Sequence, residues 1–213
     1  MKPVPILIAG LVLGAFAIVG VTLVAVTHAA TAGRIAANDR MTMLKKLEAI
    51  VPPGSIGNDP ITDRIEVQAA DLLGNASTNV YRVRKDGEGV ALVLNPVVPD
   101  GYAGPIKLLV AVMKDGSLGG VRVVSHHETP GLGDKIEEQR NDWIFGFTGK
   151  SLDDPTEDQW KVKRDGGVYD QFTGATITPR SIVKAVANTL RFVKAQGEGL
   201  YTQPAVAPAK EAS

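Results

Sequence analysis

The sequence contains no cysteine among its 213 residues, and this absence excludes several classes of protein. Without cysteine the chain forms no disulfide framework, and it holds no thiolate-bound iron–sulfur cluster, no c-type haem and no lipidated N-terminal cysteine. If the protein carries electrons, an organic cofactor must therefore carry them. An excess of charge of one sign is also missing, since 23 Lys and Arg balance 23 Asp and Glu. This balance argues against a nucleic-acid partner, which usually requires a basic surface.

Charged side chains are scarce at the N-terminus, where residues 4–26 contain none and Lys2 is the one charge before Arg34. A helix over this run reaches about 35 Å, enough to cross a hydrocarbon core of about 30 Å. We predict a single membrane anchor over residues 1–33. A cleaved signal peptide is the alternative, because residues 30–32 (Ala-Thr-Ala) resemble a cleavage site. The apolar run is longer than the 7–15 residues that are typical of a signal peptide, which favours the anchor.

The rest of the chain alternates helix-like and strand-like segments, separated by loops rich in Gly, Asn, Asp and Pro. The hydrophobic periodicity predicts helices over residues 34–50, 134–147 and 179–194. It predicts strands over residues 62–68, 79–84, 89–94, 107–113 and 121–125, with a hairpin turn at Asp115-Gly116. We therefore expect an α+β fold, in which an antiparallel sheet packs with a few helices and one N-terminal transmembrane helix is added.

These segments divide the chain into four regions. After the anchor, residues 34–60 are expected to form a membrane-proximal helix and a linker. Residues 61–200 are expected to form one globular domain. Residues 201–213 are rich in Pro and Ala and are expected to be disordered.

The segment from Asp170 to Arg180 is the first with chemical character. We expect Thr178 to cap a helix with Pro179 at its first position, after a compact turn over residues 173–176. Free N–H groups and the positive end of the helix dipole favour a phosphate at such a place, and Arg180 fits an anion there. An ordinary capped helix that binds nothing is the alternative explanation of the same spacing.

A second segment, residues 126–134, begins with two histidines and Glu128. Neighbouring residues of a strand point to opposite faces, so His126 and His127 are poorly placed to bind one metal ion. The glycines in this segment do not complete a dinucleotide-binding fingerprint, because Ile136 occupies the place of the third glycine. We assign no metal ligand and no catalytic residue. The Pro- and Gly-rich loop is suited to a close approach between the backbone and a flat ligand.

Together the two segments resemble a known family. The sequence Asp170-Gln-Phe-Thr-Gly-Ala-Thr176 resembles the Asp-x-x-Ser/Thr-Gly-Ala-Thr signature of proteins that carry covalent FMN. With Glu-Thr-Pro-Gly-Leu-Gly at residues 128–133, in the expected order, the chain resembles the G subunit of Rnf (Rsx) electron-transport complexes over about residues 1–195. The sodium-pumping NADH:quinone oxidoreductase has a related C subunit, which is usually longer.

The resemblance implies one FMN per chain, joined through its phosphate to the hydroxyl of Thr176, with residues 61–200 as the FMN-binding domain. It implies that a separate flavin transferase attaches the FMN, because a threonine hydroxyl without an adjacent base is a weak nucleophile. The other residues expected to form the cofactor site lie in the two motifs; they are Asp170, Thr173, Gly174, Ala175, Glu128, Thr129, Leu132 and Gly133.

The resemblance implies that the chain carries electrons within a membrane-bound Rnf complex. That complex couples electron transfer between ferredoxin and NAD to ion translocation. Other membrane and peripheral subunits of the complex are then the partners. The charges around the anchor do not decide its orientation. Flavin transferases of this family act outside the cytoplasm, which implies a bacterial inner-membrane protein with a periplasmic C-terminal domain. The alternatives are the C subunit of the sodium pump, a membrane-tethered flavoprotein sensor, and an assembly subunit with an unmodified Thr176.

Overall fold

The computed structural model describes residues 4–206, and the chain divides after Met43 into two compact units. Helix α1 (Val4–Glu48) makes up the described part of the first unit and continues for a few residues into the second. It has 45 residues, and its apolar part is long enough to cross a membrane. About 20 residues suffice for a crossing, and the apolar part of α1 before Arg34 provides them without the charged residues that follow.

Residues 44–51 belong to the second unit. Leu47, Ile50 and Val51 are buried, and the guanidinium of Arg122 donates a hydrogen bond of 3.1 Å to the carbonyl of Ala49. Although residues 34–60 are expected to include a linker, this part of the segment packs into the domain. The end of α1 is therefore held by side-chain packing.

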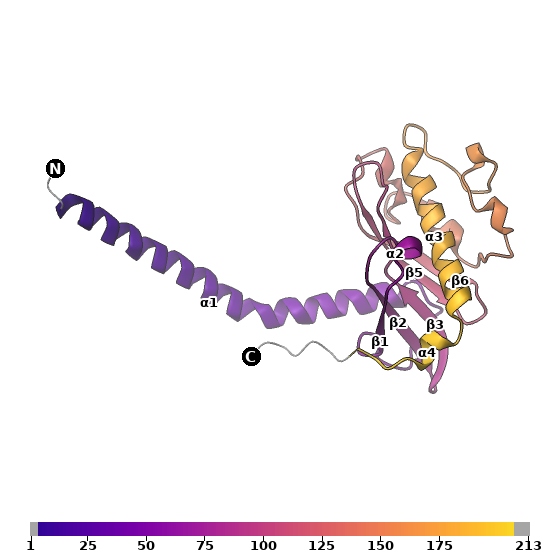
Figure 1. The fold of residues 1–213 in the computed structure, drawn as a ribbon, viewed down its shortest axis with the longest axis horizontal. Helices are drawn as coiled ribbons and strands as arrows, with labels where there is room; N and C mark the ends of the chain where they lie inside the picture. The colour runs from indigo at the N-terminus through magenta and orange to yellow at the C-terminus, as the bar shows by residue number, and fades with distance from the viewer. Residues whose placement is uncertain (1–3, 207–213) are drawn as a thin grey trace. The chain divides into compact units, whose positions relative to one another are not determined.

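Six strands in the described part of the chain form one sheet in the order β1-β2-β3-β5-β4, with β6 also paired to β5 (Figure 1). They are β1 (Arg64–Val67), β2 (Thr78–Lys85), β3 (Glu88–Leu94), β4 (Val97–Val98), β5 (Ile106–Met113) and β6 (Leu118–Ser125). All pairings are antiparallel. The five predicted strands are confirmed, and the predicted α+β class is confirmed with them. Strand β4 was not predicted, because two residues between Pro96 and Pro99 are too few to show a pattern.

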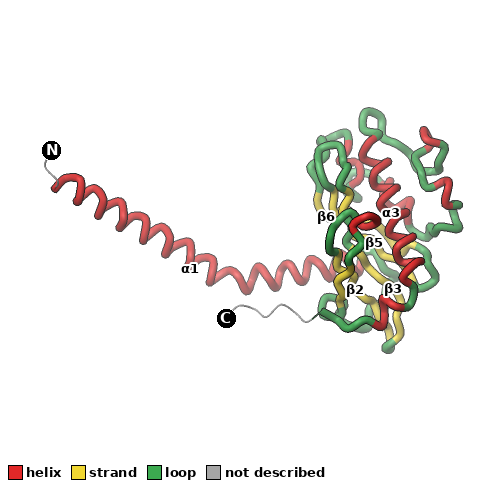
Figure 2. The backbone as a smooth tube through the Cα atoms, viewed as in Figure 1, coloured by secondary structure: helices red, strands yellow, loops and turns green. Residues whose placement is uncertain are grey.

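Helix α3 (Ile177–Gln196) lies across one face of this sheet (Figures 1 and 2). Its apolar stripe packs into the core, where Ile182, Val186 and Leu190 are buried with side chains of β3, β5 and β6. This burial is the main force that holds α3 against the sheet, because each such side chain contributes roughly 1.5–3 kcal/mol. Its N-terminal end is thus placed by the fold as a whole.

The predicted helix over residues 134–147 is wrong. The structure has two short 3-10 helices there, η1 (Gly133–Ile136) and η2 (Asp142–Phe147), joined through extended backbone at Glu137. The apolar residues of this segment do not face one helix stripe. Phe147 instead stacks on Tyr169 at 4.7 Å between ring centroids, and Trp143 meets Phe172 edge-on at 5.2 Å. Packing against these distant rings overrides the helical spacing.

The remaining elements are short. They are α2 (Ala70–Leu73), η3 (Glu157–Gln159), η4 (Lys163–Asp165) and α4 (Gly199–Thr202).

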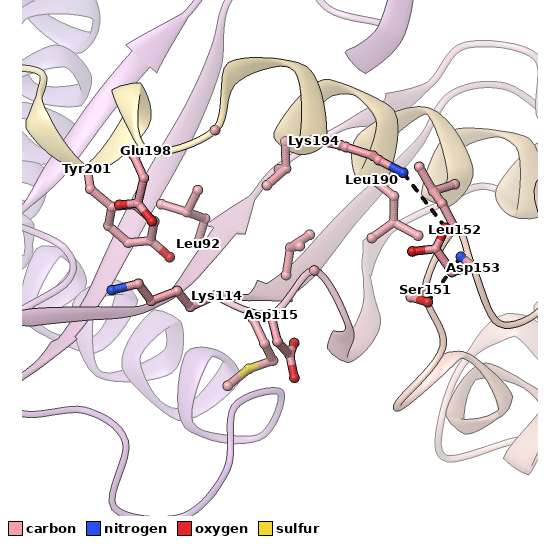
Figure 3. A pocket seen from close by; sticks show the side chains of 15 residues that line it. Leu92, Lys114, Asp115, Ser151, Leu152, Asp153, Leu190, Lys194, Glu198 and Tyr201 are labelled. Carbon is pink, nitrogen blue, oxygen red and sulfur yellow. Dashed lines mark hydrogen bonds and ion pairs between the residues drawn. The ribbon is translucent and has the colours of Figure 1, made fainter.

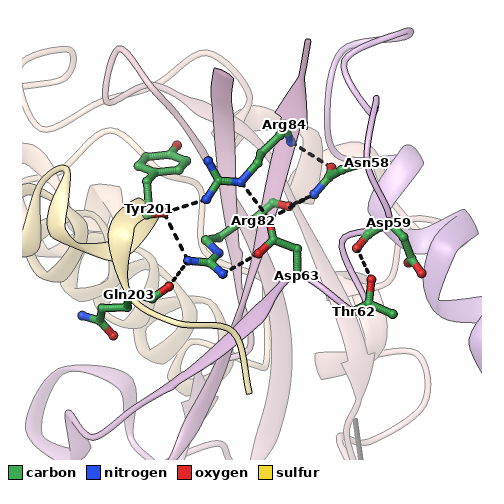
Figure 4. Close-up of polar contacts among 8 residues, drawn as sticks. All are labelled: Asn58, Asp59, Thr62, Asp63, Arg82, Arg84, Tyr201 and Gln203. Atoms are coloured by element: carbon green, nitrogen blue, oxygen red, sulfur yellow. Dashed lines mark hydrogen bonds and ion pairs between the residues drawn. The ribbon is translucent and has the colours of Figure 1, made fainter. Parts of the chain in front are cut away.

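The C-terminal segment is ordered as far as residue 206, in contrast to the disorder expected from residue 201 onward; residues 207–213 lie outside the described residues. Arg82, only 3% exposed, donates hydrogen bonds to the carbonyls of Tyr201 and Gln203 (Figure 4). Asp63 pairs with Arg82 and also with Arg84, the latter at 2.7 Å. Buried guanidinium groups need acceptors, and the carbonyls of this segment supply them.

Candidate functional site

A compact turn leads into α3, as the sequence predicts. The N–H of Ala175 donates a hydrogen bond of 3.1 Å to the carbonyl of Phe172, and Gly174 has a φ of +83°. This is a left-handed conformation that glycine adopts without strain. The turn places Thr173 and Gly174 at the surface and leaves Thr176 half-buried at the start of the helix.

The start of α3 differs from the prediction, which placed Thr178 as the N-cap and Pro179 at the first position. The helix begins at Ile177, so Thr176 occupies the N-cap. Its backbone has φ −77° and ψ −27°, and its side chain makes no capping hydrogen bond. An N-cap threonine usually has extended backbone and accepts an N–H from the first turn. Here Pro179, at the third position, has no N–H to donate.

The hydroxyl of Thr176 is consequently free. Among the described residues, no side chain or backbone group forms a hydrogen bond with its Oγ1. In the first turn of α3, the N–H groups of Ile177 and Thr178 have no acceptor within the helix. A free hydroxyl therefore lies beside free N–H donors at the positive end of a 20-residue helix.

The carboxylate of Glu128 lies beneath this turn. The side chain is only 4% exposed, and it accepts hydrogen bonds from the hydroxyl of Thr178 and from the N–H of Ala103, the latter at 3.1 Å. Two glycines enclose it. A Cβ at Gly133 would lie 2.6 Å from Oε2, and a Cβ at Gly101 would lie 3.0 Å from Oε1.

The loop over residues 128–133 contacts the turn before α3. The N–H groups of Leu132 and Gly133 both donate to the carbonyl of Thr129, at 3.1 Å each. Leu132 is 41% exposed, and its Cδ2 lies 3.3 Å from where a Cβ would stand on Gly174. The structure thus brings together the two motifs that the sequence separates by about 40 residues.

Comparisons with known proteins match both units. The FMN-binding domain family matches residues 101–191, and the RnfG N-terminal region matches residues 1–50. The G subunit of the ion-translocating oxidoreductase complex of Pseudomonas aeruginosa (strain UCBPP-PA14) is 48% identical over 191 residues, which cover 89% of each chain. The proteins of the same name from Vibrio cholerae serotype O1 (strain M66-2) and Shewanella amazonensis are 41% and 43% identical, over 92% of this chain and 93% and 91% of theirs.

The chain belongs to the family of G subunits of ion-translocating oxidoreductase complexes. It is a membrane protein with an FMN-binding domain, and the matched domain includes both the loop over residues 128–133 and the turn at Thr176.

The residues at the turn fit an FMN. A phosphate needs donors and an FMN ring needs apolar contact, and the first turn of α3 offers both. Besides the free hydroxyl and N–H groups, Ile177 is 45% exposed next to Thr176, and Leu132 is exposed against Gly174. These two side chains are apolar groups at the surface of the domain, where a bound ring would cover them.

Asp170 lies at the edge of this site. Its carbonyl accepts a hydrogen bond of 2.8 Å from the indole N–H of Trp143, and its carboxylate pairs with Lys163 at 2.6 Å. Asp170 therefore holds the beginning of the turn against η2 and η4. Apart from this ion pair, its side chain is exposed at the surface.

Two side chains of these segments, Arg180 and His126, have partners within the chain. Arg180 forms two hydrogen bonds with Asp165, at 2.6 and 2.9 Å, and this contact holds the pKa of the Asp165 carboxyl below its ordinary value. Arg180 thus has a carboxylate partner within the chain. His126 accepts the N–H of Glu128 at Nδ1, at 3.0 Å, and its Nε2 lies 2.8 Å from Glu137, so both ring nitrogens are occupied.

The sequence did not reveal that Ala103 and Gly101 surround Glu128, or that Thr178, expected as a helix cap, donates its hydroxyl to that carboxylate. The glycines at positions 101 and 104 suggest that the backbone there approaches another group closely. They do not show that this group is the carboxylate of Glu128.

A cavity of about 290 Å³ lies near the opposite end of α3, between Leu92, Leu190 and Tyr201 (Figure 3). Lys194 and Asp153 form an ion pair at its rim, at 3.8 Å. None of the predicted cofactor residues lines this cavity, so it is separate from the turn at Thr176.

Proposed function

We propose that Thr176 carries one FMN, joined through a phosphoester to its Oγ1, and that the chain is the electron-carrying subunit of an Rnf-type complex. The free hydroxyl at the N-cap of α3 is the observation that supports this most strongly, because it is neither spent on capping nor paired with another group. When bound, FMN supplies redox chemistry that links one-electron and two-electron partners.

The residues of this chain bind and orient the cofactor. The N–H groups of Ile177 and Thr178 face the phosphate, where the positive end of α3 stabilises negative charge. Thr173, Gly174 and Ala175 form the turn that brings Thr176 to the surface, while Thr129, Leu132 and Gly133 form the adjoining loop. Because the phosphate is the point of attachment, the far end of the cofactor stays free to face a redox partner.

A separate flavin transferase is required in this proposal. A threonine hydroxyl needs a general base within about 3.2 Å to become a nucleophile. Among the described side chains none forms a hydrogen bond with the hydroxyl of Thr176. The transferase supplies the base, and the exposed Asp170 together with the turn over residues 173–176 is what it recognises.

The proposed function also requires that the chain belong to an ion-translocating complex and that its FMN-binding domain lie on one defined side of the membrane. The relatives are subunits of ion-translocating oxidoreductase complexes, and we propose that this chain joins such a complex, relaying electrons between ferredoxin and NAD. We propose further that α1 lies in the inner membrane with the FMN-binding domain on the periplasmic side. A reporter fused after Gln203 tests the orientation, since activity of a cytoplasm-specific reporter would contradict it.

The attachment is tested on the full chain, produced together with a flavin transferase and separated by denaturing electrophoresis. We expect a fluorescent band for the wild type and for Thr176→Ser. We also expect the intact protein to gain the mass of one FMN less one water, because the transferase moves the FMN moiety of FAD to Oγ1, breaks the pyrophosphate bond and releases AMP. Thr176→Ala should give no fluorescence. Thr148→Ala, which changes an exposed threonine outside the turn, serves as the matched control. Fluorescence that persists in Thr176→Ala would refute the proposed attachment.

A further inference from the structure

Two threonine hydroxyls near the start of α3 have opposite surroundings. Thr178 is fully buried and donates its hydroxyl proton to Oε2 of Glu128. Thr176, two residues earlier, is half-buried and makes no side-chain hydrogen bond in the described part of the chain. The hydroxyl of Thr178 therefore anchors the turn, and the hydroxyl of Thr176 is left available for attachment.

The anchor is built for this contact. Glu128 accepts from Thr178 with one oxygen and from the N–H of Ala103 with the other, and Gly133 and Gly101 leave room for the carboxylate. No cation is paired with Glu128 among residues 4–206. Two donors and the positive end of α3 are what stabilise its charge.

A second hydrogen bond joins α3 to residues 100–103, the segment that contains Ala103. The hydroxyl of Ser181 donates to the carbonyl of Asp100 at 2.8 Å, and residues 100–103 continue directly to the N–H that Glu128 accepts. The N-terminal end of α3 is thus fixed by neighbours from outside the helix. Such neighbours replace the side-chain cap that Thr176 does not provide.

We propose that Glu128 and Thr178 are positioning residues for flavin attachment. Their hydrogen bond holds the first turn of α3, so that Thr176 keeps its helical backbone and its hydroxyl stays free of capping and open to the flavin phosphate. This inference rests on the proposed attachment at Thr176. It assigns Glu128, which the resemblance places among the cofactor contacts, to the support beneath the attachment site.

The test follows flavin transfer to the full chain in detergent micelles, with a purified flavin transferase and FAD, by in-gel fluorescence over time. Thr178→Val removes the hydroxyl at nearly constant volume and should slow transfer about tenfold, the factor that the loss of a hydrogen bond to a charged group commonly produces. Thr178→Ser keeps the hydroxyl and should restore transfer to within about twofold of the wild-type rate.

Thr189→Val is the matched control. Thr189 is also fully buried in α3, and its hydroxyl donates to the carbonyl of Ala185 at 2.8 Å, away from the turn. Its transfer rate should equal that of the wild type. Equal rates for Thr178→Val and Thr189→Val would overturn the inference while leaving the attachment at Thr176 intact. Loss of the signal in Thr176→Ala separately tests the attachment itself.

Glu128→Gln provides a second variant in case Thr178→Val folds poorly. The amide has one acceptor in place of two, so transfer should again slow about tenfold. The double variant Glu128→Gln/Thr178→Val should be no slower than the slower single variant, because both changes break one contact. If the double variant instead transferred flavin about a hundredfold more slowly than the wild type, the two single effects would multiply. That result would show that the two residues act independently and would overturn the inference.

Discussion

Gly133 occupies a position at which a methyl group has no space, and this gives a quantitative prediction for Gly133→Ala. The added Cβ would stand 2.6 Å from Oε2 of Glu128 and 3.2 Å from the hydroxyl of Thr178. Both neighbours are buried and joined to each other, so neither yields freely. Overpacking of this kind costs about 1–3 kcal/mol in the free energy of unfolding. For a domain of this size a loss of about 2 kcal/mol lowers Tm by about 4–8 °C.

Tryptophan fluorescence during urea unfolding of the full chain measures this change. The only two tryptophans, Trp143 and Trp160, lie in the FMN-binding domain, so the signal reports the unfolding of that domain and not of α1. Gly146→Ala is the control, because a Cβ there meets nothing within 4 Å and the φ of Gly146 is not positive. A difference below about 0.5 kcal/mol between the two variants would refute the reasoning, since it would show that the loop yields to the methyl group without cost.

Three further predictions concern the same domain. Phe147→Ala removes a fully buried ring that packs on Tyr169 and should cost about 3–5 kcal/mol in the same unfolding assay. Asp63→Asn leaves the buried Arg82 without its charge partner and should cost about 2–4 kcal/mol. Limited proteolysis should then cleave residues 201–206 sooner than in the wild type. Burial, and secondarily the negative charge of Glu198, raises the pKa of Tyr201 to about 12, above its value near 10 in the unfolded chain. The stability that this shift contributes is therefore present below pH 10 and lost as the pH rises toward 12. Tyr201→Phe should flatten that part of the pH–stability profile, and an unchanged profile would contradict the assignment.

Local patterns in the sequence predicted the regular elements well. The alternation of apolar residues located β2, β3 and β5 to within one residue, and Asp115-Gly116 marked the hairpin between β5 and β6. The stripe of Ile182 and its neighbours located α3 in the same way. These features follow from chemistry within a few residues of each position, which is why a single sequence reveals them.

The helix predicted over residues 134–147 shows where such patterns fail. Its apolar residues have helical spacing, but Trp143 and Phe147 pack against rings from residues 160–172, and this packing favours two short 3-10 turns. The order of residues 201–206 has a similar cause. Acceptors for Arg82, about 120 residues earlier in the chain, hold that segment in place.

The sequence by itself determined that this protein has an apolar N-terminal helix, an α+β domain with an antiparallel sheet, and two motifs that resemble those of covalent flavoproteins. Only the tertiary structure decided the roles of the two threonines. Which hydroxyl anchors the turn and which stays free depends on Glu128, whose carboxylate reaches Thr178 across 50 positions in the sequence. Helix propensity and spacing act over a few residues, whereas a buried carboxylate takes its donors from whichever segments the fold brings within about 3 Å.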